Sequence, residues 1–479
     1  MRVVKIGLLV ICFFACSLGV SAQIWPPAGM LGTGDSISPW EINTPEHLNA
    51  LADYVNTGNG NSTNGICYKL TNDIDLSGYN WVSIGYNDDP HIFSSTFQGY
   101  FDGNNKTVKN LTINRPMEVL LGLFGFIYSA SIENLGVEDC NIVGFGVLGG
   151  LVGVSLNNST IANCYVTGSV SGNDKFIGGL VGRNYNSTIS NSYAVVNVSG
   201  EESTGGLAGY SGRFGGDTTS KSIISNCYVA GSVSGGMGIG GLVGENGWTI
   251  VSNSYATCNV SGEEYVGGLL GVNFANSSIS NCIATNESVI SSVNTSMINR
   301  IAGFNEDGSI CNNNYALSTM VVQNGSGTVN ITNGLNTIAG MEKDVNILQS
   351  LLFYTTTGNW YNNTTWDITS STAVWDICEG KTLPWLRWQK IDCNKIGIAE
   401  VVEMINIKIF PNPAQSQFTV TNTENADIQL FNALGQEVFH TYSKEESTVV
   451  EVGSLPQGVY MLKVVQKDGS FSVHKVVKR

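Results

Sequence analysis

The sequence predicts an all-β protein: a right-handed parallel β-helix with a helical N-terminal cap, followed by a small antiparallel β-sandwich. A short glycine motif recurs through the middle of the chain, and each copy contains short β-prone segments separated by Gly, Asn or Ser. Glycine accounts for 57 of the 479 residues but has no three-residue period, which excludes collagen. Such short segments cannot bury a face alone, whereas stacked copies can, and this is how a solenoid is stabilised.

The repeated motif is Gly-Leu-x-Gly. Its copies begin at Gly122, Gly150, Gly179, Gly206, Gly241 and Gly268, and a degraded copy follows at 301–305. An Ile-x-Asn or Val-x-Asn signature follows each of the six copies, and Val-Ser-Gly closes four of them. Six copies in the same internal order predict one coil of a β-helix per copy.

Stacking the copies in register predicts three rows of side chains. The first inward row is Leu151, Leu180, Leu207, Leu242 and Leu269; the second is Ile132, Ile161, Ile189, Ile224, Val251 and Ile279. A corner row, whose amides can bond along the axis, is Asn134, Asn163, Asn191, Asn226, Asn253 and Asn281. Cys164, Cys227 and Cys282 follow alternate corner asparagines and would lie two coils, ~9.6 Å, apart, so we expect free thiols.

Residues 23–118 are predicted to form the N-terminal cap and first coils. Thr44 is a helix N-cap, Pro45 occupies the first helical position, and Leu48, Leu51, Ala52 and Val55 form an apolar stripe that Gly58 ends. The acidic residues of this region are Asp73, Asp75, Asp88, Asp89 and Asp102. They could suggest calcium, but they match no EF-hand spacing, and we favour turn and capping roles.

Residues 317–390 are predicted to form C-terminal coils and a Trp-rich cap, with a helix at 341–351. Five tryptophans lie in this segment: Trp360, Trp366, Trp375, Trp385 and Trp388. They could form a sugar-binding platform, but we favour a hydrophobic cap over the last coil. Cys378 and Cys393 are the best candidates for a disulfide, and two unpaired thiols are an equal alternative.

Residues 1–22 are predicted to be a signal peptide. Arg2 and Lys5 precede an apolar run, and small residues at 20–22 allow cleavage before Gln23. A lipoprotein signal at Cys16 is disfavoured by the bulky Phe14. No later segment reaches ~18 apolar residues, so we expect an exported chain without a transmembrane span.

The Gly-Leu-x-Gly, Ile-x-Asn and Val-Ser-Gly signatures together resemble the GLUG motif family of bacterial surface and secreted proteins. The resemblance covers the repeat region, 119–316. It implies a parallel β-helix. The family has no agreed activity and occurs in adhesin-like proteins and beside peptidase domains, so the resemblance supports the fold more than a function.

After a linker at 391–406, residues 407–479 alternate apolar and polar positions between turns, which predicts an antiparallel β-sandwich. Pro411-Asn412-Pro413, the segment 432–438 (NALGQEV) and Gly458-Val459-Tyr460 occur in the order of the type A sorting domain of type IX secretion, which this tail resembles. The resemblance implies recognition of residues 407–479 by the type IX translocon. The body would then be secreted or displayed on the outer surface of a Gram-negative bacterium.

Catalysis is weighed because some β-helices degrade polysaccharides. The repeats hold no convincing carboxylate pair, no His occurs between positions 92 and 439, and cations are few. We therefore assign no catalytic, cofactor-binding or metal-binding residue, and keep a polysaccharide lyase or hydrolase as the alternative. The net charge of −15 also disfavours nucleic acid as a partner.

The candidate ligand-binding residues follow the glycine motif. They are Tyr185, Tyr210, Arg213, Phe214, Trp248 and Phe274. An aromatic residue and an amide recur there, and an insertion at 210–217 accounts for one longer repeat. Stacked outward, these aromatics would bind sugar rings or a protein surface; inward packing is the alternative. We expect a non-catalytic adhesin or binding rod for an extracellular glycan or protein.

Overall fold

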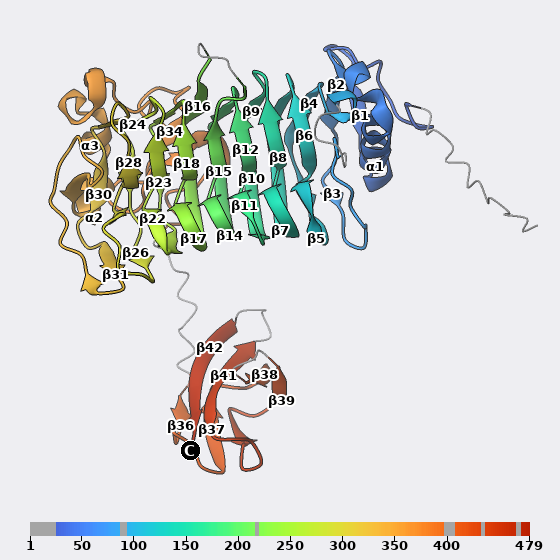
Figure 1. The fold of residues 1–479 in the computed structure, drawn as a ribbon. Coiled ribbons are helices and arrows are strands. Elements are labelled where there is room, and N and C mark those ends of the chain that lie inside the picture. The colour runs from blue at the N-terminus through green and yellow to red at the C-terminus, as the bar shows by residue number, and fades with distance from the viewer. Residues whose placement is uncertain (1–24, 87–92, 216–219, 397–407, 433–435, 466–470) are drawn as a thin grey trace, which may run out of the picture. The chain divides into compact units, whose positions relative to one another are not determined.

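The computed structural model describes residues 25–86, 93–215, 220–396, 408–432, 436–465 and 471–479 (Figure 1). The predicted signal peptide lies outside these residues. The chain divides into two compact units, one ending at Ile391 and one formed by 392–479. We describe each unit by itself.

The first unit is a parallel β-solenoid, as predicted. One face is a seven-stranded parallel sheet made of β6 (Phe124–Tyr128), β8 (Val152–Leu156), β12 (Val181–Tyr185), β15 (Ala208–Gly212), β18 (Val243–Gly247), β23 (Leu270–Phe274) and β28 (Ala302–Asn305). Each of these strands begins within a glycine motif, because the copies stack in register. The seven strands lie side by side along the body in Figure 1.

The other faces form one continuous, mostly parallel sheet. Its longest strands are β4 (Tyr100–Lys109), β5 (Thr112–Leu121), β7 (Ser131–Gly149), β10 (Tyr165–Gly172), β14 (Tyr193–Gly205) and β17 (Tyr228–Gly240). The first Ile-x-Asn signature lies on β7, and the other five lie on or next to β9 (Thr160–Ala162), β13 (Thr188–Ser190), β16 (Ser222–Ser225), β19 (Thr249–Ser252) and β24 (Ser278–Ser280). β29 (Ile310–Asn312) continues this face in the degraded copy. The later coils add β20 to β22 between 255 and 267, β25 to β27 between 283 and 299, and β30 to β32 between 315 and 328.

Both predicted aliphatic rows point into the solenoid. Every residue of the leucine row and of the isoleucine row is completely buried. The isoleucine row is in exact register: Ile161 pairs with Ile132 on one side and with Ile189 on the other. The rows are continuous with one long core, so each coil is stabilised mainly by burial against its two neighbours.

The glycines of the repeated motif are required by close backbone contacts. A Cβ atom on Gly150 would lie 2.4 Å from a methyl group of Val166 and 2.6 Å from the carbonyl oxygen of Gly179. A Cβ atom on Gly153 would lie 2.6 Å from the carbonyl oxygen of Gly125. Neither position can hold a side chain without moving backbone, which explains why both glycines of the motif recur.

The corner asparagines form the predicted row, but their amide ladder is interrupted. All six have a left-handed backbone, for example Asn163 with φ 54° and Asn191 with φ 50°. Asparagine tolerates this conformation better than most residues. Asn163 donates to the side-chain carbonyl of Asn134 over 3.0 Å, and Asn226 donates to that of Asn191 over 3.2 Å. Within the described residues, no side-chain hydrogen bond joins Asn163 to Asn191, Asn226 to Asn253 or Asn253 to Asn281, so the ladder consists of two separate pairs.

The residue after each corner asparagine is buried. The backbone N–H of Cys164 donates to the hydroxyl of Ser192, and that of Cys227 donates to Ser254, both over 3.0 Å. The alternation of Cys and Ser therefore pairs a backbone donor with a hydroxyl acceptor in the next coil. Cys164, Cys227 and Cys282 are free and buried, as predicted.

The N-terminal cap contains the predicted helix, α1 (Pro45–Tyr54). The side chain of Thr44 accepts from the backbone N–H of His47, and Leu48, Leu51 and Ala52 face the core. β1 (Trp40–Ile42) pairs with β2 (Cys67–Leu70), which pairs with β4 and so joins the cap to the first coils, and β3 is Ile74–Asp75. Asp75 and Asp102 accept backbone N–H groups two residues ahead, which are turn roles; Asp88 and Asp89 lie outside the described residues.

The end of the solenoid differs from the prediction. Residues 341–351 do not form one helix: β33 (Met341–Lys343) pairs with β30, and two short helices follow, α2 (Val345–Leu348) and α3 (Leu351–Thr355). The helical pattern is broken because Met341–Lys343 extends the sheet and the backbone of Ser350 is extended at the start of a new helix. β34 (Trp375–Asp376) and β35 (Trp385–Leu386) form a small hairpin further on.

The tryptophans do not simply close the last coil. Residues 344–391, which we call the strap, return along the side of the solenoid and cover a row of tyrosines. Trp360, Trp366, Trp375 and Trp385 are buried there, so these four cannot serve as a sugar platform. The tyrosine rings on the side of the coils form an apolar surface, and the tryptophans of the strap are buried against that surface as well as at the end of the solenoid. Cys378 and Cys393 are both disulfide-bonded.

The second unit is the predicted antiparallel β-sandwich. One sheet contains β36 (Ile409–Phe410), β37 (Gln417–Thr421) and β40 (Ser447–Glu451). The other contains β39 (Glu437–Ser443), β38 (Ala426–Phe431), β41 (Gly458–Val465) and β42 (Phe471–Lys478). Phe418 and Val450 of the first sheet and Leu430 and Leu462 of the second are buried in one core.

Candidate functional site

The predicted site lies on the seven-stranded sheet, where alternate side chains point in opposite directions. The amides point inward: Asn184, Asn246 and Asn273 are completely buried. Asn184 bonds to Ser155 and to Ser211 over 3.0 and 3.1 Å, and Asn246 donates to Asn273 over 2.7 Å. The amide and the aromatic of each copy therefore have separate roles, because the amides hold the coils together from inside.

Tyr185, Tyr210 and Phe274 lie on the outer side of the same sheet. They contact Phe176 of β11 (Lys175–Gly178) and Phe214, which follows the end of β15. We call the set Phe176, Tyr185, Tyr210, Phe214 and Phe274 the aromatic face. The ring of Tyr210 lies 5.4 Å from that of Tyr185, 5.7 Å from that of Phe176 and 6.4 Å from that of Phe274, measured between centroids. Tyr185 also contacts Phe214 at 5.6 Å. Four of the six predicted residues therefore belong to one group of contacting rings.

Two glycines create the space in which these rings lie. A Cβ atom on Gly212 would lie 2.3 Å from the ring of Tyr210. A Cβ atom on Gly247 would lie 2.8 Å from the ring of Phe274. Each ring therefore covers a position with no side chain and spreads over the sheet. The face is assembled by side chains of different coils, so no single repeat could reveal it.

The other two predicted residues form a pair. The guanidinium of Arg213 lies over the ring of Trp248, 3.9 Å from its centroid, within the range of a cation–π contact. Arg213 precedes Phe214 directly, at the start of the insertion. Phe214 is 52% exposed, whereas Arg213 and Trp248 are half-buried. Asp217, at the end of the predicted insertion, lies outside the described residues.

Charged groups border the aromatic face. The guanidinium of Arg183 lies 3.8 Å from the centroid of Phe176, and burial lowers its pKa. Burial also raises the pKa of the Glu245 carboxyl, with a smaller contribution in the same direction from Glu202. The pKa of Tyr210 rises to about 12, again mainly because of burial. At neutral pH the tyrosine hydroxyls of the face are thus uncharged and able to donate hydrogen bonds.

Sequence reasoning missed a second aromatic surface, the tyrosine row beneath the strap. Tyr165, Tyr193, Tyr228 and Tyr255 stack in consecutive coils with centroid distances of 5.0, 4.8 and 5.1 Å. The recurrence of Tyr after the Ile-x-Asn signature was visible in the sequence. Its meaning depended on the strap, which lies far along the chain from these tyrosines and carries no repeat.

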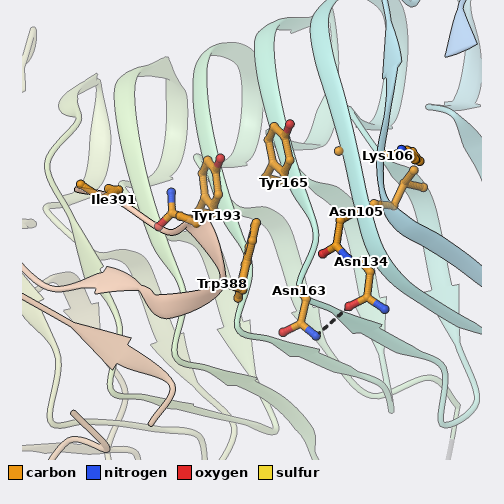
Figure 2. Close-up of a pocket in the computed structure, with 11 residues that line it drawn as sticks. Asn105, Lys106, Asn134, Asn163, Tyr165, Tyr193, Trp388 and Ile391 are labelled. Atoms are coloured by element: carbon orange, nitrogen blue, oxygen red, sulfur yellow. Dashed lines mark hydrogen bonds between the residues drawn. The ribbon is translucent and has the colours of Figure 1, made fainter. Parts of the chain in front are cut away.

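The strap covers the first tyrosines of the row, Tyr165 and Tyr193, only in part, through Trp388, and a pocket remains there (Figure 2). Figure 2 shows Trp388 next to Tyr193 and Tyr165, with Asn163, Asn134, Asn105 and Lys106 on the adjoining coils. None of these residues was among the predicted site residues.

The described ranges contain no group of three His, Cys, Asp or Glu side chains that could hold a metal ion. Nor does any helix within them have the length and hydropathy needed to cross a membrane.

The fold and its tail define an exported β-solenoid protein, and the comparisons with known proteins specify it further. Residues 408–479 match the secretion system C-terminal sorting domain. Residues 146–171, 177–199 and 262–290 match the GLUG motif. The two resemblances stated from the sequence are thereby confirmed: the chain carries GLUG repeats and a type IX sorting domain, which indicates secretion or attachment to the cell surface.

The relatives say little about activity. The chain is 33% identical over 156 residues to Halomucin of Haloquadratum walsbyi, a stretch that covers 32% of this chain and 2% of that protein. A crystal structure from Bacteroides ovatus, of a protein provisionally named an immunoglobulin A1 protease, is similar with a TM-score of 0.43 and 20% identity. The similarity covers 66% of this chain and 88% of the other. The matched stretch thus spans only a small part of Halomucin.

Proposed function

We propose that the protein is a non-catalytic binding rod, an adhesin that contacts an extracellular glycan or protein through the aromatic face. The observation that carries this proposal is the set of contacting rings on the outer side of the seven-stranded sheet. Aromatic rings provide a large contact area at low entropic cost and stack on sugar rings as well as on protein side chains.

The scaffold beneath the face suits this role. The buried amide row fixes the strands in register, so the outward rings are held in place before a ligand arrives. A repeating rigid face can make several weak contacts with one extended ligand, and their combined affinity exceeds that of each contact. Export with the sorting domain would bring the face into contact with extracellular ligands.

The test is binding of the chain from Gln23 to Arg479 to an array of glycans and host proteins. The double variant Phe214→Ala with Trp248→Ala should remain folded and bind its array ligand at least about tenfold more weakly, because it removes two of the larger accessible rings. Tyr442→Ala is a matched control: Tyr442 is 54% exposed and lies on the C-terminal unit. Unchanged binding by the folded double variant would exclude this site.

Polysaccharide cleavage is the second candidate function, and one observation favours it. Glu245 borders the aromatic face with a raised pKa, the property that a general acid needs near neutral pH. The test is turnover of a polysaccharide panel by the wild-type chain and by Glu245→Gln. Turnover that Glu245→Gln abolishes would establish this alternative and contradict the binding proposal.

A further inference from the structure

The pocket at the end of the strap has a clear structural origin. The tyrosine row stops at Tyr165, because the position that pairs with it in the preceding coil is Gly136. A Cβ atom on Gly136 would lie 2.4 Å from the ring of Tyr165, so that ring leans over the glycine. The strap contributes Trp388, Gln389 and Ile391 to the lining. The result is a cavity of about 320 Å³, within the size range of small-molecule sites.

One side of the pocket is aromatic. Tyr165 and Tyr193 are stacked with their planes 8° apart. The indole of Trp388 lies 6.1 Å from Tyr165 and 5.6 Å from Tyr193. Trp388 is held by a hydrogen bond from Nε1 to the backbone carbonyl of Asn191 over 3.0 Å. Unlike the four buried tryptophans of the strap, it is only half-buried. The pocket therefore presents a fixed aromatic wall.

The opposite side is polar and only partly bonded within the protein. One of the open positions of the corner amide ladder lies here: Asn163 donates to Asn134, but its side-chain oxygen accepts no hydrogen bond from the described residues. Within the same described ranges, the side chains of Asn105 and Lys106 form no hydrogen bond or ion pair. The pocket thus offers donors and acceptors at its wall beside an aromatic surface.

We propose that this pocket binds one sugar unit of a neutral glycan, as a site separate from the aromatic face. A pyranose has an apolar C–H face, which stacks on aromatic rings, and hydroxyls at its edge, which bond to amide and ammonium groups. The two walls match these two parts. The pocket belongs to the strands β4, β7, β10 and β14 and to the strap. The aromatic face is centred instead on β12, β15 and β23 of the seven-stranded sheet.

The charges around the pocket favour a neutral ligand over a phosphorylated one. Lys106 is the one cation among the lining residues. Two carboxylates are adjacent: Glu138 accepts the hydroxyl of Tyr165 over 2.5 Å, and Asp102 accepts the amide of Asn134 over 3.0 Å. Phosphate recognition is strongest with several converging cations, and Lys106 is accompanied here by two carboxylates instead.

The experiment measures binding of the chain from Gln23 to Arg479 to an array of neutral, uronic-acid and phosphorylated oligosaccharides. We expect a neutral oligosaccharide to bind. Trp388→Ala should weaken this binding about tenfold or more, because it removes the stacking wall. Because Trp388 also anchors the strap through its hydrogen bond to Asn191, a second variant changes the polar wall alone: Asn105→Gly with Lys106→Ala. Glycine at 105 retains the left-handed backbone of Asn105, φ 56°, so this variant should fold and bind severalfold more weakly.

The control is Phe214→Ala with Trp248→Ala, which alters the other surface and should leave this binding unchanged. Loss of the binding in this control, with retention in the two pocket variants, would place the glycan on the aromatic face and overturn the pocket proposal. Binding confined to phosphorylated or uronic-acid oligosaccharides, or no binding by any glycan on the array, would also overturn it. If both pocket variants bind the glycan as well as the wild-type chain does, the pocket proposal is overturned. That outcome leaves the proposed function of the aromatic face standing.

Discussion

The indole Nε1 of Trp388 donates a hydrogen bond to the backbone carbonyl of Asn191, a residue 197 positions earlier in the chain, over 3.0 Å. Asn191 has a left-handed backbone at the solenoid corner. The same pattern recurs along the strap, where Trp366 donates to the backbone carbonyl of Asn281 over 3.2 Å. The corner asparagines thus join the coils to each other and also provide the acceptors on which the strap is anchored.

The strap should contribute strongly to stability. Trp366 is buried at 2% exposure between Tyr354 and Trp375 and makes one of these anchoring bonds. Trp366→Ala should lower the free energy of unfolding by about 3–5 kcal/mol, because it leaves a cavity and an unsatisfied carbonyl. Chemical denaturation monitored by circular dichroism measures this change. The control is Trp248→Ala, which removes a half-buried ring outside the strap and should lower the free energy of unfolding much less. Equal losses in the two variants would show that the strap does not contribute more to stability than the rest of the surface.

The corner conformation can be tested at Asn191, whose side-chain oxygen accepts from Asn226 over 3.2 Å. Asn191→Gly keeps the left-handed backbone and loses one hydrogen bond, so it should cost about 0.5–1.5 kcal/mol. Asn191→Ala also adds the cost of the left-handed conformation, about 1–2 kcal/mol more. Thermal or denaturant unfolding of the two variants measures the difference. Equal stability of the Ala and Gly variants would mean that backbone conformation does not determine the choice of Asn.

The fold could be predicted from the sequence because its cause is local and repeated. The fully buried row from Leu151 to Leu269 and the left-handed Asn row are visible as periodic positions, and Thr44 with Pro45 marks the helix start. In the sequence alone, Gly136 cannot be distinguished from the many glycines that form turns. Its importance appears only when Tyr165 is placed over it by the register of β7 and β10.

The candidate site was predictable in part for the same reason. Tyr185, Tyr210 and Phe274 occupy repeat positions, and their outward direction follows from strand alternation once the amides are known to point inward. Trp388 could not be assigned, because its contacts are with Tyr165 and Tyr193, far away in sequence. A non-repetitive segment such as the strap has no periodic signal that would reveal its docking surface.

Stability should depend on pH through Glu245. Its pKa is raised mainly by burial, so the folded chain holds this proton more tightly than the unfolded chain. The stabilisation from protonation is complete below the unfolded value of about 4.5 and is lost as the pH rises through the folded pKa. Glu245→Gln should therefore raise the midpoint of thermal unfolding at pH 7 relative to wild type, and do so less at pH 4.

The exposed Glu287 provides the matched control, since Glu287→Gln changes the same formal charge on another coil of the same unit. It should shift the unfolding midpoint little at either pH. A Glu245→Gln variant that is destabilised at pH 7 would show instead that the ionised carboxylate makes a favourable interaction.

Export should depend on the C-terminal unit. Deleting Lys408–Arg479 removes the matched sorting domain, so the body should accumulate in the periplasm of the producing bacterium. The first unit has its own continuous core, so the truncated body should still fold there. Fractionation and immunoblotting of the truncated and full-length chains measure the outcome. Normal surface display of the truncated chain would refute the role of the sorting domain.

The central claim is that the protein binds its ligand without converting it. The direct measurement is a calorimetric titration of the chain from Gln23 to Arg479 with the array ligand, followed by mass spectrometry of that ligand from the same sample. We expect saturable binding and a ligand of unchanged mass after prolonged incubation. A ligand recovered as shortened or otherwise altered products would contradict the account and identify the protein as an enzyme.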